Sequence, residues 1–150
     1  MASRFNLRVY GIVVNLNDEV LLSHESRNGF EFTKFPGGGV EFGEGLGEAL
    51  NREFLEEIGV QVKDYHLFYV NDFFQPSAFN PTDQLVSFYF LVTLDLNEVN
   101  TNLSKLPKDA ISSSDFERVS WHPIQALTTK DVTFPIDQEV LAKLKATLPN

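Results

Sequence analysis

The feature that most constrains this chain is the stretch from residue 37 to residue 60, which reads GGGVEFGEGLGEALNREFLEEIGV. Its apolar residues recur at the spacing of one helix face, and they are Leu46, Leu50, Phe54 and Ile58. Gly45 stands where an N-cap is expected, with Glu48 able to bond back to it, and Gly59 stands where helices end in the left-handed region. We therefore expect a glycine-rich turn, a short strand and then a helix that lies on a sheet.

The acidic residues of this expected helix are concentrated at its C-terminal end. Glu53, Glu56 and Glu57 share one patch, because side chains three and four positions apart are neighbours on a helix. The helix dipole disfavours carboxylates at that end by about 0.3–1 kcal/mol each, and the three groups also repel one another. A solvated acidic face is the usual explanation for such a helix. A bound divalent cation is the alternative, since Mg²⁺ prefers carboxylate oxygens as ligands.

This segment resembles the Nudix box, G-x5-E-x7-R-E-U-x-E-E-x-G-U, in which U is a bulky aliphatic residue. The residues that fill the fixed positions in order are Gly38, Glu44, Arg52, Glu53, Phe54, Glu56, Glu57, Gly59 and Val60. Phe54 is the one departure, because it is aromatic where an aliphatic residue is usual, although the position stays apolar. At average residue frequencies, a chance match to this pattern within 150 residues is very rare.

The resemblance to the Nudix hydrolase family, which includes MutT-like proteins, implies a fold and an activity. The implied fold is α+β, a mixed β-sheet sandwiched between α-helices, formed by residues 1–150 as a single domain. The implied activity is that of a hydrolase that uses Mg²⁺ or Mn²⁺ to cleave the pyrophosphate (phosphoanhydride) bond of a nucleoside diphosphate linked to another group. ADP-ribose, nucleotide sugars and nucleoside triphosphates are the substrate classes that this leaves open.

Carried over position by position, the resemblance also implies roles for individual residues. The metal ligands would be Glu53, Glu56, Glu57 and a backbone carbonyl near Gly37. The catalytic residues would be Glu53 as general base, Glu57, and Arg52, which would orient a glutamate through a salt bridge.

Three further acids have roles that the resemblance leaves open. Glu44 matches a box position that is structural or an outer metal ligand. Some members of the family take the general base from a later loop, and Asp115 and Glu117 are the candidates for that role here.

The rest of the chain predicts further strands and a second helix. Strands are expected at residues 7–14, 19–24, 30–35, 61–70, 85–94 and 116–121. The first two should form a hairpin across the turn at residues 15–18. The polar stretch 97–114, which contains Ser112, Ser113 and Ser114, is expected to be a mobile loop. An amphipathic helix is expected at residues 135–148.

The stretch 71–83, NDFFQPSAFNPTD, is expected to be a long functional loop. Its aromatic residues could stack on a nucleobase, and Phe73 and Phe74 are the candidate substrate-binding residues. The alternative is that these rings simply fill the edge of the core. Pro76 lies 16 positions beyond Val60, as a proline does in ADP-ribose-cleaving members of the family, which slightly favours that substrate.

Composition limits the classes of partner. The formal net charge of −9 argues against binding of a nucleic-acid polymer, which needs clustered basic residues. The absence of cysteine excludes disulfides, zinc–thiolate sites and cysteine nucleophiles. There is no apolar signal region and no run of about 18 apolar residues, so we expect a cytoplasmic protein without membrane spans. A homodimer is left open.

Two other function classes are kept beside the hydrolase. A non-catalytic Nudix-fold module could sense a nucleotide or a sugar, although a pure binder has no need of three repelling acids. An acidic module could bind Ca²⁺ nonspecifically, which would leave the glycine triplet and Arg52 unexplained.

Overall fold

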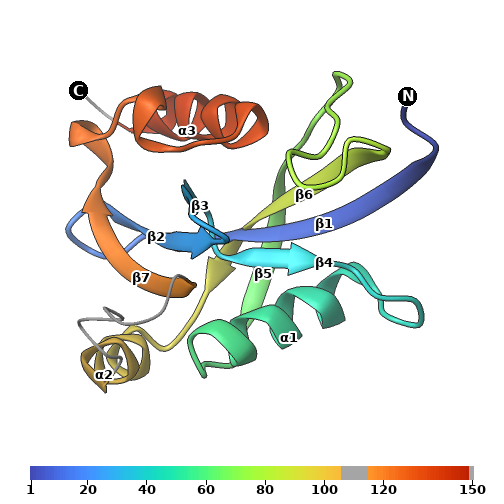
Figure 1. The fold of residues 1–150 in the computed structure, drawn as a ribbon. Coiled ribbons are helices and arrows are strands. Elements are labelled where there is room, and N and C mark those ends of the chain that lie inside the picture. Colours follow the sequence, from blue (N-terminus) through green and yellow to red (C-terminus); the bar gives the residue numbers. More distant parts are fainter. Residues whose placement is uncertain (106–114, 149–150) are drawn as a thin grey trace.

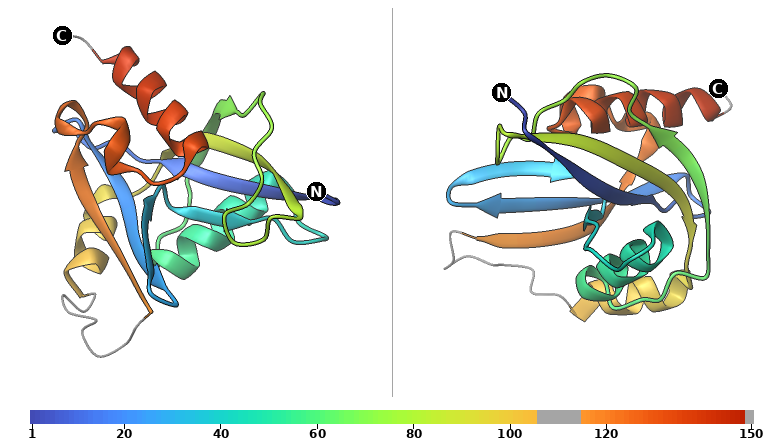
Figure 2. Two further views of the ribbon diagram at one scale, coloured as in Figure 1. Left: turned by 45° about the horizontal axis from the view of Figure 1, so that its top comes forward. Right: turned by 90° about the vertical axis from the view of Figure 1, so that its right-hand side faces the viewer.

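The computed structural model describes residues 1–105 and 115–148 of the chain. Its strands form two sheets, and helices cover them from both sides (Figure 1). Helix α3 (Pro135–Thr147) lies on one side, and helices α1 (Leu46–Glu57) and α2 (Leu96–Lys105) lie on the other. Figure 2 shows the same arrangement from two further directions. The expected α+β sandwich is therefore confirmed, with the strands divided between two sheets.

The larger sheet has the strand order β4-β1-β6-β5. Its members are β1 (Arg4–Ile12), β4 (Gly37–Gly39), β5 (Asp64–Val70) and β6 (Asp83–Thr93). Strand β1 runs parallel to β6 and antiparallel to β4, and β5 runs antiparallel to β6. The smaller sheet is antiparallel, in the order β3-β2-β7. Its members are β2 (Glu19–Arg27), β3 (Phe30–Lys34) and β7 (Phe116–Pro123).

Strand β1 supplies both hydrophobic cores, because successive side chains of a strand point to opposite faces. Val9, and Val13 just past the end of the strand, belong to the core beneath α1, whereas Tyr10 and Ile12 belong to the core beneath α3. Two 3₁₀ turns, Ile124–Ala126 and Thr129–Asp131, connect β7 to α3. The sheets therefore separate two sides of the molecule, and the even-numbered residues of β1 face α3.

Helix α1 confirms the local signals in the sequence. Its N-cap is Gly45, whose N–H donates to Glu48 Oε1 at 3.0 Å. Gly59, just past its end, has a φ of +76°. Leu50 and Phe54 are completely buried, so the predicted apolar face is the one that packs on the sheet. Within the described residues, no helix is long and apolar enough to cross a membrane.

Two predictions about strands were wrong. The expected hairpin of the first two strands is reduced to one bridge, between Val14 and Val20, because β1 continues beside β6 and β2 joins the other sheet. The glycine triplet Gly37–Gly39 was expected to be a turn. It forms β4, because its backbone pairs with Arg8, Val9 and Tyr10 of β1.

The prediction of a loop at residues 97–114 was also wrong for its first part. Residues 96–105 form α2, whose Val99 is completely buried against the core beneath α1. The weak helix propensity of this polar segment is overcome by packing, as is common for short helices. The serines at 112–114 lie outside the described residues.

Candidate active site

Two glycines bring β4 against the acidic end of α1. Gly37 has a φ of +146°, and a Cβ there would lie 2.1 Å from the carbonyl oxygen of Val9. A Cβ at Gly38 would lie 2.4 Å from Oε1 of Glu53. Position 37 therefore requires glycine, because its φ is in the left-handed region and a Cβ would clash with the backbone of β1. A side chain at Gly38 would instead displace the carboxylate of Glu53. This close approach places backbone groups and carboxylates at one surface.

Arg52 connects the loop before α1 to the acidic face of the helix. Its guanidinium donates to both carboxylate oxygens of Glu44, at 2.6 and 2.9 Å, and to the carbonyl of Gly39 at 2.9 Å. It also donates to Glu53 Oε1 at 3.0 Å and lies 3.4 Å from Glu56. The Arg52 hydrogen bonds lower the pKa of Glu44 to about 2. Arg52 is thus placed to orient Glu53, and Glu44 serves to anchor Arg52.

The acids of the box line one cavity together. Glu53, Glu56 and Glu57 line it from α1, Glu117 lines it from β7, and Gly37–Gly39 line it from β4. The side chains of Glu53 and Glu57 are 14% and 9% exposed, whereas that of Glu56 is 59% exposed. The three predicted ligands therefore line the same cavity, which we call the acidic cavity.

Glu57 is the most buried of the three and has two fixed contacts. Its Oε2 accepts from the N–H of Gly37 at 3.0 Å, and its Oε1 lies 3.7 Å from the ammonium of Lys34. Burial raises the pKa of Glu57 to about 8, although the charge of Lys34 opposes the rise. Because a metal ligand must be ionised, a cation at this site would have to displace that proton.

The donor set of the acidic cavity suits a hard divalent cation. Glu25, Glu57 and Glu117 each offer an oxygen within 4.8 Å of the others, and Glu53 and Glu56 lie beside them. All these groups are oxygen donors, the kind that Mg²⁺ and Mn²⁺ take. The residues therefore fit such an ion. Glu25 does not line the acidic cavity, but it lies beside Glu57 and Glu117, and sequence reasoning missed it. The only signal was a charged residue on a mostly buried strand.

The two later acids are placed very differently. Glu117 belongs to the acidic cavity, so it remains a candidate general base. Asp115 accepts a hydrogen bond from the N–H of Asn28 at 2.9 Å, which holds the turn between β2 and β3. Asp115 does not line the acidic cavity, and it does not line the second cavity described below.

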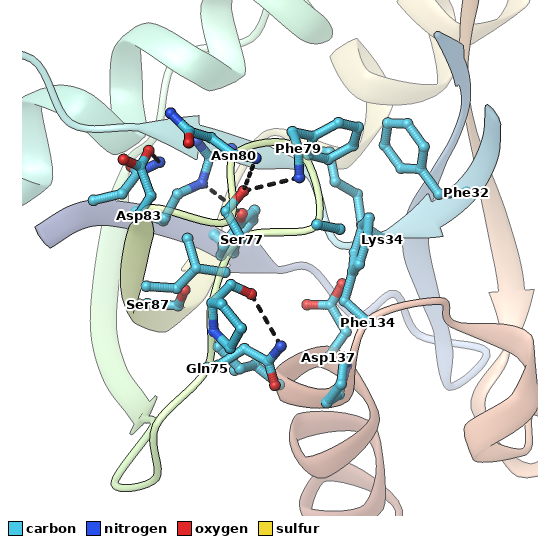
Figure 3. A pocket seen from close by; sticks show the side chains of 18 of the residues that line it. Phe32, Lys34, Gln75, Ser77, Phe79, Asn80, Asp83, Ser87, Phe134 and Asp137 are labelled. Atoms are coloured by element: carbon cyan, nitrogen blue, oxygen red, sulfur yellow. Dashed lines mark hydrogen bonds between the residues drawn. The ribbon is translucent and has the colours of Figure 1, made fainter. Parts of the chain in front are cut away.

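A second cavity of about 270 Å³ lies on the α3 side of the sheet, next to the acidic cavity. Its wall includes the rings of Phe32, Phe79 and Phe134, whose centroids are 5.3 to 6.0 Å apart. Figure 3 shows the loop residues around Phe79 on one side of the space, and Lys34 and Asp137 on another. We call this space the aromatic cavity. It offers flat apolar surfaces together with a few polar groups, as small-molecule sites do.

The candidate substrate-binding residues of the long loop do not form this wall. Phe73 and Phe74 are 38% and 61% exposed, and neither lines the aromatic cavity or the acidic cavity. Phe79, six residues after Phe73 in the same loop, does line the aromatic cavity. That aromatic residues of this loop contact a ligand stays a prediction, and of Phe73, Phe74 and Phe79 it is Phe79 that lies at a cavity.

Asp137, in the first turn of α3, forms part of the aromatic cavity and is almost completely buried. Its Oδ1 accepts a hydrogen bond from the hydroxyl of Tyr89. Burial raises the pKa of Asp137 from 3.8 to about 7, while the Tyr89 hydrogen bond and the charges of Lys34 and Arg8 oppose the rise. The folded protein therefore keeps a proton that the unfolded chain loses near pH 4.

We expect Asp137→Asn to change how stability depends on pH. In the wild type, the contribution of Asp137 to the free energy of unfolding is complete below about pH 4 and is lost as the pH rises to about 7. The gap from 3.8 to about 7 corresponds to roughly 4 kcal/mol at most. Urea unfolding at pH 4.5 and pH 8 should show that the variant loses less stability than the wild type. The exposed Asp72→Asn variant is the control, and parallel profiles for wild type and Asp137→Asn would contradict the expectation.

Comparison with known proteins gives one family match. A family model described as NUDIX domain matches residues 4–144. No curated protein matches the chain. A MutT structure from work on Aliivibrio salmonicida and Vibrio cholerae is 24% identical, covers 96% of this chain and 99% of that chain, and has a TM-score of 0.67.

Two further solved structures are similarly related. A NUDIX hydrolase from Nitrosomonas europaea is 23% identical over 94% of this chain and 88% of that chain, with a TM-score of 0.64. A MutT NUDIX hydrolase from Burkholderia pseudomallei is 17% identical over 93% of this chain and 98% of that chain, with a TM-score of 0.68. At these identities the likeness shows a shared fold.

Proposed function

The chain belongs to the NUDIX family of hydrolases, and we propose that it is a divalent-metal-dependent pyrophosphohydrolase of small nucleoside diphosphate derivatives. The observation that carries this proposal is that Glu53, Glu56 and Glu57 line one cavity, next to a second cavity with aromatic walls. The acidic cavity contains four carboxylates, those of the three box acids and Glu117, and the net charge of the chain is −9. Because these charges repel a diphosphate, its approach needs a bound positive charge. Metal binding at the acidic cavity meets that need.

In the proposed site, Mg²⁺ or Mn²⁺ would be held by Glu53, Glu56 and Glu57, with the backbone near Gly37 adjacent. The ion would supply neutralisation of phosphate charge and a water molecule of lowered pKa. Glu53 would accept the proton of the attacking water, since Arg52 holds its carboxylate at 3.0 Å in a fixed orientation.

The reaction would be hydrolysis of a phosphoanhydride. The water oxygen would form a new bond to one phosphorus, and the bond from that phosphorus to the bridging oxygen would break. The leaving phosphate would keep the electron pair, and the proton of the water would pass to Glu53. The products would be two phosphate monoesters from ADP-ribose or a nucleotide sugar, and a nucleoside monophosphate and pyrophosphate from a nucleoside triphosphate.

The aromatic cavity would hold the nucleoside end of the substrate. Phe79 and Phe134 offer ring faces and edges at its wall, and Asp137 and Ser87 offer polar groups for the base or the ribose. Such an arrangement suits ADP-ribose, a nucleotide sugar or a nucleoside triphosphate equally well. The bond cleaved is thus a phosphoanhydride, carried by a small nucleoside diphosphate derivative.

The proposed function is tested by hydrolysis assays on a panel of nucleoside diphosphate derivatives. With Mg²⁺ present, at least one member of the panel should be cleaved to phosphate monoesters. Excess EDTA should abolish the activity, and added Mg²⁺ or Mn²⁺ should restore it, because the carboxylates alone would repel the diphosphate. Tight binding of nucleotides without any cleavage would instead favour a sensing module and would contradict the proposal.

A further inference from the structure

Three basic side chains line both the acidic cavity and the aromatic cavity. They are Arg8 of β1, Arg27 of β2 and Lys34 of β3. A molecule that extends from one cavity to the other must pass these three side chains. They differ greatly in how many of their N–H groups are already used by the protein.

Lys34 has no donor left for a ligand. Its ammonium lies 3.2 Å from Glu25 Oε2, and it donates to the carbonyl oxygens of Phe35 and Gly37 at 3.2 and 3.1 Å. An ammonium has three N–H groups, so these three acceptors account for all of them. Lys34 therefore holds the chain between β3 and β4 in place.

Arg27 is exposed, and its guanidinium contacts a carboxylate and two aromatic rings. Its side chain is 60% exposed and lies 3.5 Å from Glu25. Its guanidinium also lies over the rings of Phe32 and Phe79, at 5.9 and 5.8 Å from their centroids. An exposed charge of this kind is hydrated and contributes little to specific binding.

Arg8 is half-buried and largely unpaired. Its Nε donates to the hydroxyl of Tyr10 at 2.9 Å, and among the described residues its other two nitrogens have no hydrogen bond or ion pair. A guanidinium has five N–H groups, so four remain available. No buried side-chain nitrogen among the described residues lacks a partner, so these N–H groups are open to solvent. The carboxylate of Glu53 attracts the charge of Arg8 without forming a hydrogen bond to it. Accessible N–H groups on a permanent cation suit an anionic ligand.

The position of Arg8 in the sheet connects the two cavities. In the register of β1 it lies opposite Gly39 of β4, which belongs to the acidic cavity. On its other side it lies opposite Ser87 of β6, which belongs to the aromatic cavity. A planar guanidinium binds two oxygens of a phosphate at once, which a point charge cannot do.

We propose that Arg8 is a substrate-binding residue that holds the diphosphate where the two cavities meet. This inference rests on the proposed function. Arg8 would contact the non-bridging oxygens of the phosphate nearer the nucleoside, so that the scissile bond lies over the acidic cavity. It takes no part in proton transfer.

Binding of imidodiphosphate, a pyrophosphate analogue that is not hydrolysed, tests this role by calorimetry in the presence of Mg²⁺. Arg8→Met should weaken the binding of this probe tenfold or more. Arg8→Lys keeps the charge but loses the planar guanidinium that can donate to two phosphate oxygens at once. Its affinity for the probe should therefore lie between those of Arg8→Met and the wild type. With a hydrolysed substrate, KM should rise by more than kcat falls. Arg118→Met, an exposed variant on β7 with the same change of charge, should match the wild type.

The outcomes separate this inference from the proposed function. Equal probe affinity in the wild type, Arg8→Met and Arg8→Lys would overturn the role of Arg8 and leave the hydrolase proposal intact. Failure of the wild type both to bind the probe and to cleave any substrate would overturn both, and if it cleaves a substrate without binding the probe, unchanged KM in Arg8→Met and Arg8→Lys would overturn the role of Arg8 alone. Should Arg8→Met fail to fold, as judged by circular dichroism, Arg8→Lys alone decides, and unchanged affinity and unchanged KM in that variant would overturn the role.

Discussion

Replacement of Glu53 by Gln is expected to lower kcat by about 10²–10⁴-fold, the range for removal of an acid–base group. The amide has nearly the shape of the carboxylate, and its oxygen can still accept the bond that Arg52 donates to Oε1 at 3.0 Å. The fold should therefore be retained while the base and one metal ligand are lost. Steady-state kinetics with the best substrate of the panel, at saturating Mg²⁺, measure the effect.

A matched control comes from the surface of α3. Glu139 forms an exposed pair with Lys143, and both side chains are 48% exposed. Glu139→Gln removes one negative charge from the protein but leaves the acidic cavity unchanged, so its kcat should equal that of the wild type. If Glu53→Gln were as active as Glu139→Gln, the assignment of Glu53 as a catalytic residue would be wrong.

Removal of the Phe54 side chain is expected to cause the largest loss of stability among single changes in α1. Phe54 is completely buried, and Phe→Ala changes at such sites lower the free energy of unfolding by about 3–5 kcal/mol. Its ring lies directly over Gly11 of β1, where a Cβ would be 2.3 Å from Phe54 Cζ. The aromatic residue that departs from the box pattern is thus accommodated by a glycine on the facing strand.

This pairing of Phe54 with Gly11 can be measured by a double-mutant cycle. Gly11→Ala should destabilise the wild type by about 1–3 kcal/mol, because the added methyl group overlaps the ring. In a Phe54→Leu background, the same Gly11→Ala change should cost clearly less, since the smaller side chain leaves room. Urea unfolding of the four proteins gives the coupling. Additive effects of the two changes would show that the ring and the glycine do not depend on each other.

The parts of the fold that sequence reasoning predicted correctly are those set by neighbouring residues. Helix α1 could be bounded because Gly45, Glu48 and Gly59 act within a few positions of its ends. The three carboxylates at its C-terminal end could be grouped because helix geometry alone makes them neighbours. Their position in one cavity follows from the same local geometry once the helix lies on the sheet.

The parts that sequence reasoning missed depend on contacts between distant segments. Gly37–Gly39 form a strand only because β1 lies beside them, and nothing in three glycines indicates that partner. Arg8 and Lys34 lie at the site because two sheets and two cavities meet there. The available signal was weak: Arg8 is a charged residue within the otherwise apolar LRVYGIVV, and Lys34 is one of the polar residues that alternate with phenylalanines in FEFTKF.

The choice between the aromatic residues of the long loop illustrates the same limit. Phe73, Phe74 and Phe79 are equivalent in composition, but only Phe79 packs against Phe32 and Phe134. The direction of a loop side chain is set by the elements that the loop crosses, in this case β3 and the start of α3. Periodicity carries no information about that direction in an irregular segment.

The central claim is that the acids at the end of α1 hold a divalent cation beneath a diphosphate. Its most direct test is a crystal structure of the protein with Mg²⁺ and the α,β-methylene analogue of ADP. We expect the ion to be ligated by carboxylates of Glu53, Glu56 and Glu57 and to contact an oxygen of the diphosphate. An ion bound elsewhere, with these three side chains directed into solvent away from the phosphates, would contradict the account.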